Sequence, residues 1–353
     1  MAAPVNLELS EIGKERLVLQ DPSDEVFLHE KRQRLFKYAH TSDKQSVFQK
    51  ELLDIKDKNQ RTKLCRSSDE RSNSLMHYAA KVGNLDICKF LCEQGADLNA
   101  RGQNLMTPLQ FAARYGVKYE AENVWTCMKW IMEEDEKNHS SKTAKKDNEF
   151  FSDGRDDITI LQYAMQNTNW DRNPFVVQEL IKTKKFKITD TDKQGNTCLH
   201  LAAQFDKESN NTLLEAFLPS HDEEKDYRSQ DYIDWEDLEK CIVAENKLGM
   251  TPLHVACAIG NPDSVEYLLD IARNTINVSE IINSPDSNGS LPMSLAITSR
   301  NLKMVEILMK RGATVYEESI ITAARYELYF YCKKEEIHPN NKKLNKPKKT
   351  SVM

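Results

Sequence analysis

The segment GMTPLHVACAIGNPDSVEYLL, from Gly249 to Leu269, has the pattern of two short helices joined by a turn. Thr251 can cap the first helix with its hydroxyl group, and Pro252 suits the first helical position, where a missing N–H costs nothing. Gly260 favours the end of that helix, and Asn261 repeats the capping signal for a second one. Each predicted helix has one apolar face, formed by Leu253, Ala256 and Cys257 in the first and by Val265, Leu268 and Leu269 in the second.

The first helix of this segment recurs along the chain, in stretches that begin at Ser74, Thr107, Thr159, Thr197, Thr251 and Leu291. The sixth residue of every copy is alanine, namely Ala79, Ala112, Ala164, Ala202, Ala256 and Ala296. A small side chain at a fixed helical position lets a neighbouring helix approach closely. Because one helix pair cannot bury its own apolar face, the copies are expected to stack on one another.

Successive copies begin 33, 52, 38, 54 and 40 residues apart. The first interval is the period of ankyrin repeats, and the run from Thr251 to Ala256 resembles the ankyrin signature T-P-L-H-x-A. An Asp or Asn three residues before a glycine, as at Asp192, Asn246 and Asp286, predicts a turn between units. The resemblance implies an all-α ankyrin-repeat solenoid of about six to seven helix-turn-helix units, with hairpin tips and a concave face.

We expect the array to cover residues 29–332, after a flexible N-terminal segment over 1–28 and before a Lys-rich disordered tail over 333–353. Residues 25–58 lack the signature but have a helical apolar stripe, which predicts a degenerate first repeat that contains Leu35, Ala39, Val47, Leu52 and Leu53. The tail, with seven lysines up to Lys349, is a localisation patch, a contact for an anionic surface, or simply a disordered end.

The two longest intervals predict two long polar insertions, at about 133–157 and 219–240. The first is mixed in charge and is expected to be a mobile loop. The second holds nine acidic and three basic residues, with Tyr227, Tyr232 and Trp235 among them. It is either a docking site for a basic partner or a solvated loop whose aromatic side chains lie back on the array.

The composition bounds the class of protein. The formal net charge is -6 and both signs are mixed along most of the chain, which argues against a protein built to bind nucleic acid. No run of about 18 apolar residues occurs, so no transmembrane segment is expected. No secretory signal is recognisable either, and the predicted location is cytoplasmic, with membrane association only through a channel complex.

Chemical motifs are scarce. His77, His200 and His254 recur at the fourth position of their units, where hydrogen bonding near the helix start is favoured over a shared metal ion. Cys88 and Cys92 offer half a zinc site or two packed thiols, and the second is favoured. Phosphate-binding and hydrolase motifs are absent, so no catalytic, cofactor-binding or metal-binding residue is predicted and no cofactor is expected.

Exposed positions in the predicted turns and in the acidic insertion are the candidate contacts for a protein partner. They are Arg101, Gln103, Asn104, Lys193, Gln194, Lys247, Leu248, Ser287, Asn288, Tyr232 and Trp235. The stretch LCEQGADLNA, Leu91 to Ala100, resembles the pattern that asparaginyl hydroxylases accept in ankyrin proteins, which nominates Asn99 as a site of modification.

Three functions remain open. The first is a non-catalytic protein-protein interaction module. The second is a cytosolic regulatory or assembly portion of a cation channel, because the lengthened stretch between Leu269 and Gly289 resembles the cytosolic arrays of ankyrin-type transient receptor potential channels. The third, an enzyme with a site in an insertion, has no motif in its favour. We predict the first, with the second as the alternative.

Overall fold

The computed structural model describes residues 22–41, 43–117, 120–139, 159–167, 174–206, 212–217, 233–275 and 278–315. The named elements within these ranges are α-helices and one short 3-10 helix, and an isolated β-bridge joins Ser68 and Ser74. None of the helices described there is both long and apolar enough to cross a lipid bilayer.

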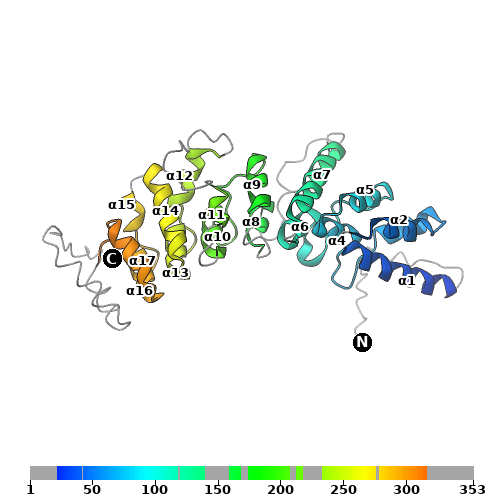
Figure 1. Ribbon diagram of the computed structural model, residues 1–353, viewed down its shortest axis with the longest axis horizontal. Coiled ribbons are helices and arrows are strands. Elements are labelled where there is room, and N and C mark those ends of the chain that lie inside the picture. The colour runs from blue at the N-terminus through cyan, green and yellow to red at the C-terminus, as the bar shows by residue number, and fades with distance from the viewer. Residues whose placement is uncertain are drawn as a thin grey trace, which may run out of the picture.

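The helices form two rows that run the length of the array (Figure 1). The inner row consists of the first helix of each repeated unit: α4 (Leu75–Val82), α6 (Pro108–Tyr115), α8 (Ile160–Met165), α10 (Cys198–Phe205), α13 (Pro252–Ile259) and α16 (Pro292–Thr298). Each inner helix packs on the next in chain order. The predicted solenoid of stacked helix pairs is therefore confirmed.

The outer row is made mainly of second helices: α5 (Leu85–Glu93), α7 (Ala121–His139), α9 (Phe175–Lys182), α12 (Trp235–Val243), α14 (Pro262–Thr275) and α17 (Leu302–Lys310). Shorter elements complete the chain: η1 (Gln103–Leu105), α11 (Thr212–Glu215) and α15 (Val278–Ile282). Before the first repeated unit stand α1 (Pro22–Ala39), α2 (Gln45–Leu53) and α3 (Lys58–Cys65).

Local signals explain where these helices begin and end. Thr107 caps α6 and exchanges hydrogen bonds with Gln110, and Thr251 does the same with His254 at the start of α13. The alanines at the sixth position of all six copies are fully buried, because this position faces the neighbouring helices. Gly83 ends α4 in a left-handed conformation with φ of 76°, which only glycine adopts without cost.

Three helices extend into segments that were expected to lie outside the repeats. Helix α1 begins at Pro22, inside the segment 1–28 that was expected to be flexible. Helix α7 continues to His139, past the expected start of the first insertion at 133, and Asp135 in this stretch is buried and accepts from the Asn99 side chain. The end of the second insertion is helix α12, which buries Leu238, Cys241 and Ile242. Residues 140–158, 218–232 and the tail 333–353 lie outside the described residues.

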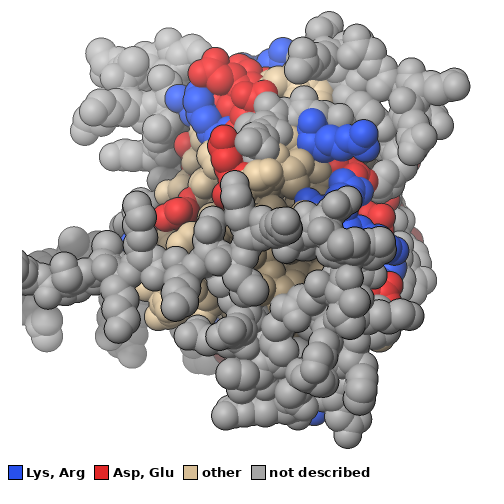
Figure 2. Space-filling model, turned by 90° about the vertical axis from the view of Figure 1, so that its left-hand side faces the viewer, with Lys and Arg blue, Asp and Glu red and all other residues tan. Residues whose placement is uncertain are grey.

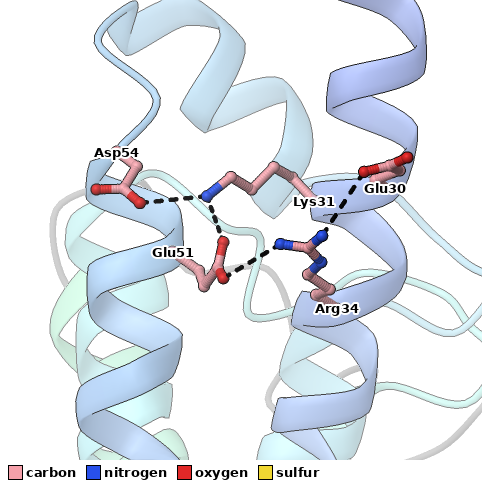
Figure 3. A network of polar contacts seen from close by, with 5 residues as sticks. All are labelled: Glu30, Lys31, Arg34, Glu51 and Asp54. Carbon is pink, nitrogen blue, oxygen red and sulfur yellow. Dashed lines mark hydrogen bonds and ion pairs between the residues drawn. The ribbon is translucent and has the colours of Figure 1, made fainter.

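The first unit is held together by an ion-pair network between α1 and α2 (Figure 3). The Lys31 side chain is only 9% exposed and binds the carboxylates of Glu51 and Asp54, while Arg34 contacts Glu51 and Glu30. Burial lowers the pKa of Lys31, but the bonds to the two carboxylates outweigh it and the pKa is raised.

The apolar stripe predicted for this first unit is correct only in part. Leu35, Ala39 and Leu52 are fully buried, whereas Val47 and Leu53 are exposed and Phe48 is buried in their place.

Candidate protein-interaction surface

The turns between units share one hydrogen-bonded design. In the turn of Asp192, the Oδ1 atom accepts from the backbone N–H groups of Gln194 and Asn196, and the Gly195 N–H donates to the Asp192 carbonyl. Asn246 and Asp286 organise their turns in the same way. The side chain of the first residue thus replaces backbone partners that a tight turn lacks.

Two further turns belong to this series. Asp69 accepts from the N–H groups of Arg71 and Asn73, in a turn where Ser72 takes the positive φ that glycine has elsewhere. The turn from Gly102 to Met106 lacks the Asp or Asn, and the backbone bond from Gly102 N–H to the Met106 carbonyl closes it. The sequence pattern of Asp or Asn three residues before Gly marks neither turn, although Arg101, Gln103 and Asn104 were predicted as turn residues.

Neighbouring tips are bonded to each other. The Lys247 N–H donates to the Gln194 carbonyl over 2.9 Å, and the Ser287 N–H donates to the Leu248 carbonyl over 3.0 Å. The Gln103 N–H likewise donates to Oδ1 of Asn73 over 2.9 Å. These bonds join the tips into two rows, one over residues 192–290 and one over 69–106, in which each turn is fixed relative to the next.

Most of the predicted contact residues project from these rows. Gln103 is half-buried, and the other turn residues are exposed: Arg101, Asn104, Lys193, Gln194, Lys247, Leu248, Ser287 and Asn288. Leu248 is the most unusual of them, because an apolar side chain at a tip is 60% exposed.

The two aromatic candidates differ from the turn residues. Trp235 opens α12 and is half-buried against the core, which agrees with the expectation of an aromatic side chain that lies back on the array. Its Nε1 atom is buried without a hydrogen-bond partner among the described residues. Tyr232 lies outside the described residues.

Two of the three repeated histidines, His77 and His200, join their inner helix to the next tip. The Nδ1 atom of His77 accepts from the Ser74 backbone N–H, and Nε2 donates to the Met106 carbonyl of the following turn over 3.0 Å. His200 makes the corresponding bond to the Met250 carbonyl over 2.8 Å. Burial lowers the pKa of His77, His200 and His254, so the neutral ring is favoured at each position.

Neither histidine nor cysteine assembles a metal site in the part of the chain that is described, where no three His, Cys, Asp or Glu side chains converge. Cys88 is fully buried between α5 and α7, and a hydrogen bond with Cys127, together with burial, raises its pKa. Cys92 is half-buried, and burial raises its pKa too. These thiols pack rather than ionise.

Asn99 lies between its own turn and the outer row. Its backbone N–H donates to Asp97, and its side-chain Nδ2 donates to Oδ1 of Asp135 on α7 over 2.9 Å. The Asn99 side-chain oxygen is buried and has no hydrogen-bond partner among the described residues. An enzyme that modifies this side chain has to open the bond to Asp135 first.

The inner face, which we define as the side chains at the fifth and eighth positions of the six copies, divides into two halves. The fifth position is aromatic in the first three copies and aliphatic in the last three: Tyr78, Phe111, Tyr163, Leu201, Val255 and Leu295. The eighth position is cationic in the first two copies and uncharged afterwards: Lys81, Arg114, Gln166, Gln204, Ala258 and Thr298. Both columns are visible when the six copies are aligned.

Rings connect the aromatic half across three helices. Tyr78 of α4 contacts Phe36 of α1 edge-on, with ring centroids 6.0 Å apart, and contacts Phe111 of α6 over 5.9 Å. Phe111 in turn contacts Tyr115 over 4.9 Å, and His40 stacks on Tyr78 over 3.8 Å. The inner face over α1, α4 and α6 therefore has a continuous aromatic base.

At the opposite end of the array, acidic and basic side chains lie next to each other (Figure 2). Lys303 pairs with Asp263 over 2.6 Å, and Arg311 pairs with Asp270, so that α17 is tied to α14.

Comparison with known proteins shows similarity to ankyrin-repeat proteins. The sequence profile of the ankyrin repeats family, in three copies, matches residues 36–140 and 234–319, just over half of the chain. The human transient receptor potential cation channel subfamily A member 1 is 24% identical over 252 residues, which are 71% of this chain and 18% of the channel. The probable 26S proteasome regulatory subunit p28 of Saccharomyces cerevisiae is 25% identical over 156 residues, 44% of this chain and 58% of that subunit.

The chain thus spans less than two thirds of the length of either relative. Among solved structures, a chain in the complex of a predatory endopeptidase from Bdellovibrio bacteriovorus with its immunity protein superposes with a TM-score of 0.45 and 21% identity. That superposition covers 69% of this chain and 99% of the other.

Proposed function

Since the chain belongs to the ankyrin-repeat family, we propose that it is a non-catalytic cytoplasmic module that binds protein partners through its hairpin tips and concave inner face. The observation that supports this most strongly is the row of exposed tip residues whose turns are fixed by bonds from one unit to the next. Binding by a preorganised surface loses little conformational entropy. An exposed leucine at such a tip, Leu248, is suited to become buried by a partner.

The test compares three forms of the full chain as baits in affinity capture from the native cells. The tip variant carries Lys193→Glu, Lys247→Glu and Leu248→Ser, and the control variant carries Lys89→Glu and Lys129→Glu on the exposed side of α5 and α7. We expect the control to retain the partners of the unmodified chain and the tip variant to lose them. Equal recovery by all three baits would contradict binding through the tips.

The second candidate function is a regulatory or assembly role in an ankyrin-type cation channel complex. The similarity of 252 residues to the human channel favours it. Recovery of channel subunits by the unmodified bait would support this role, as would a longer transcript that encodes six apolar segments downstream of the array. Exclusive recovery of soluble proteins would argue against it.

We also propose Asn99 as a substrate of an asparaginyl hydroxylase, on the resemblance of its flanking residues and its place beside a turn. Mass spectrometry of peptides that cover Asn99, prepared from the native source, is expected to show one added oxygen atom. The Asp135→Ala variant removes the bond to the Asn99 amide and should be modified to a greater extent. Peptides without added oxygen in both forms would exclude the modification.

A further inference from the structure

Four cations lie over or beside the aromatic base at the N-terminal end of the inner face. Lys81 and Arg114 each stand three residues after an aromatic side chain of that base, Tyr78 and Phe111, and so lie on the same side of their helices. The Arg114 guanidinium lies over the ring of Tyr115, 5.5 Å from its centroid. Arg32 lies over Phe36 at 5.7 Å, and Arg71 belongs to the adjacent tip.

These cations have no carboxylate partner among the described residues. Arg114 and Arg32 donate to the backbone carbonyls of Gln166 and Ser68, and the Nε atom of Arg32 is buried without a partner there. Two acidic residues share the turn with Arg71. Asp69 already accepts from the Tyr78 hydroxyl and from two turn amides, and Glu70 is exposed and forms no ion pair with these cations. Lys31, Lys303 and Arg311 differ from these cations, because each of them forms an ion pair with a carboxylate.

Two of the cations also repel each other. Burial lowers the pKa of Lys81, and the neighbouring Arg71 lowers it further. A half-buried ammonium beside a guanidinium is unfavourable for stability when neither group contacts a carboxylate. A carboxylate brought to this place by a ligand would be attracted by both groups.

We propose that the inner face over α1, α4 and α6 binds an acidic peptide segment of a partner protein. Its carboxylates contact Arg71, Lys81 and Arg114, and its apolar or aromatic side chains pack against the exposed edges of His40 and Tyr115. The inference rests on the proposed function and adds the chemistry of the partner to it. The uncharged inner face over α10, α13 and α16 lacks such cations, so the acidic part of the segment is confined to one end of the array.

The test is a selection of binders from a random peptide library displayed on phage, with the full chain as the immobilised target. We expect the selected peptides to be rich in Asp and Glu, with aromatic or aliphatic residues between them. Because exposed charge pairs are screened by salt, affinity measured with a synthetic copy should fall as ionic strength rises. The Arg71→Glu, Lys81→Glu variant should bind that copy about tenfold more weakly or worse.

The matched control is again Lys89→Glu, Lys129→Glu, which makes the same change of charge in two outer helices of the same part of the array and should leave affinity unchanged. Lys81→Gln removes the charge without reversing it and should also weaken binding, while circular dichroism confirms that the fold is kept. Selected peptides that are neutral or basic, or acidic ones that bind the double variant equally well, would overturn this inference and leave the proposed function standing. If no peptide is selected and affinity capture also recovers no partner, both fail.

Discussion

At the scale of single residues, either histidine or glutamine at the fourth position of a unit accepts a hydrogen bond from the N-cap backbone N–H. In α4, α10 and α13 a histidine accepts from the N-cap backbone, and in α6 and α8 a glutamine does so through Oε1. Gln162 even reproduces the bond to the next turn, since its Nε2 atom donates to the Asp190 carbonyl over 2.9 Å. What all five side chains share is an acceptor for the N-cap N–H, which requires no protonated ring.

This equivalence predicts the acid sensitivity of the array. The pKa of each of the three histidines is lowered from 6.5 in the folded state, so the unfolded chain binds more protons as the pH falls. Stability is then fully present above about pH 6.5 and is lost below it, by up to about 1.36 kcal/mol per pH unit for each histidine. Replacement of His77, His200 and His254 by Gln should make the free energy of unfolding less dependent on pH between 6.5 and 5.

Urea unfolding of the unmodified chain and of the triple Gln variant across this pH range measures the free energy of unfolding of each. The carboxylates titrate in both proteins, so the difference between the two curves reports the histidines. Parallel curves of stability against pH would show that the rings are not neutral in the fold.

Gly83 and Gly289 have nearly the same positive φ but different surroundings, so substituting each of them distinguishes backbone strain from steric contact. Gly83 and Gly289 have φ of 76° and 78°. A Cβ atom on Gly83 would lie 2.6 Å from the backbone nitrogen of Val124, whereas nothing lies within 4 Å of one on Gly289. We expect Gly289→Ala to cost about 1 to 2 kcal/mol from the left-handed backbone alone, and Gly83→Ala to cost more, because α7 must move away. Denaturant unfolding of the two variants compares them, and equal losses would mean that α7 adjusts freely.

At the scale of elements, the sequence predicted the helices that carry their own start and stop signals. Thr-Pro before α6 and α13 and glycine after α4 and α13 act within a few residues, and the buried alanines repeat at one position. Helices α12 and the end of α7 were missed because their polar faces dominate their composition. In α12 the burial of Leu238 against neighbouring units stabilises the helix, and at the end of α7 the buried Asp135 binds the Asn99 side chain. A local pattern cannot reveal either contact.

The tips and the inner face also combine features that a local sequence pattern reveals with features that arise only when the units stack. The Asp-x-x-Gly signal found three turns but not the one at Asp69, where Ser72 stands in place of glycine. The cations of the inner face come from α1, α4, α6 and a turn, so their proximity is a product of stacking. The column that contains Tyr78, Phe111 and Tyr163 was available to inspection, since an aromatic side chain at a fixed repeat position is unusual beside aliphatic ones.

The docking of α1 on α2 supplies a prediction at this scale. Glu51 and Asp54 both bind Lys31, but the Glu51 side chain is 17% exposed and that of Asp54 is 51% exposed. Removal of the buried partner leaves the Lys31 charge poorly compensated, so Glu51→Gln should destabilise the first unit by about 1.5 to 3 kcal/mol. Asp54→Asn is the matched control and should cost under about 1 kcal/mol, as exposed pairs do.

Amide hydrogen exchange in α1 and α2 measures this difference. Faster exchange there in Glu51→Gln, with less change in Asp54→Asn, is the expected result. Faster exchange in Asp54→Asn than in Glu51→Gln would mean that Asp54 is the more important partner of Lys31.

At the scale of the whole molecule, each unit contacts mainly its neighbours, so stability is expected to be a sum of unit and interface terms. Ala256 is the place to test this, because it is fully buried in α13, which packs on α10 before it and α16 after it. Ala256→Leu should overpack both interfaces and cost about 1 to 3 kcal/mol. Ala258→Leu adds the same atoms at an exposed position of the same helix and should change stability by less than about 0.5 kcal/mol.

Hydrogen exchange followed by mass spectrometry then maps how far the damage extends. In Ala256→Leu we expect lost protection in α10, α13 and α16, whose interfaces are altered. Protection in α1 and α4 should be unchanged, because neither helix packs on α13. Lost protection along the entire array would mean that it unfolds as one cooperative unit. In that case, a ligand bound to the inner face over α1, α4 and α6 would stabilise the distant tips as well, and the two binding surfaces would be energetically coupled.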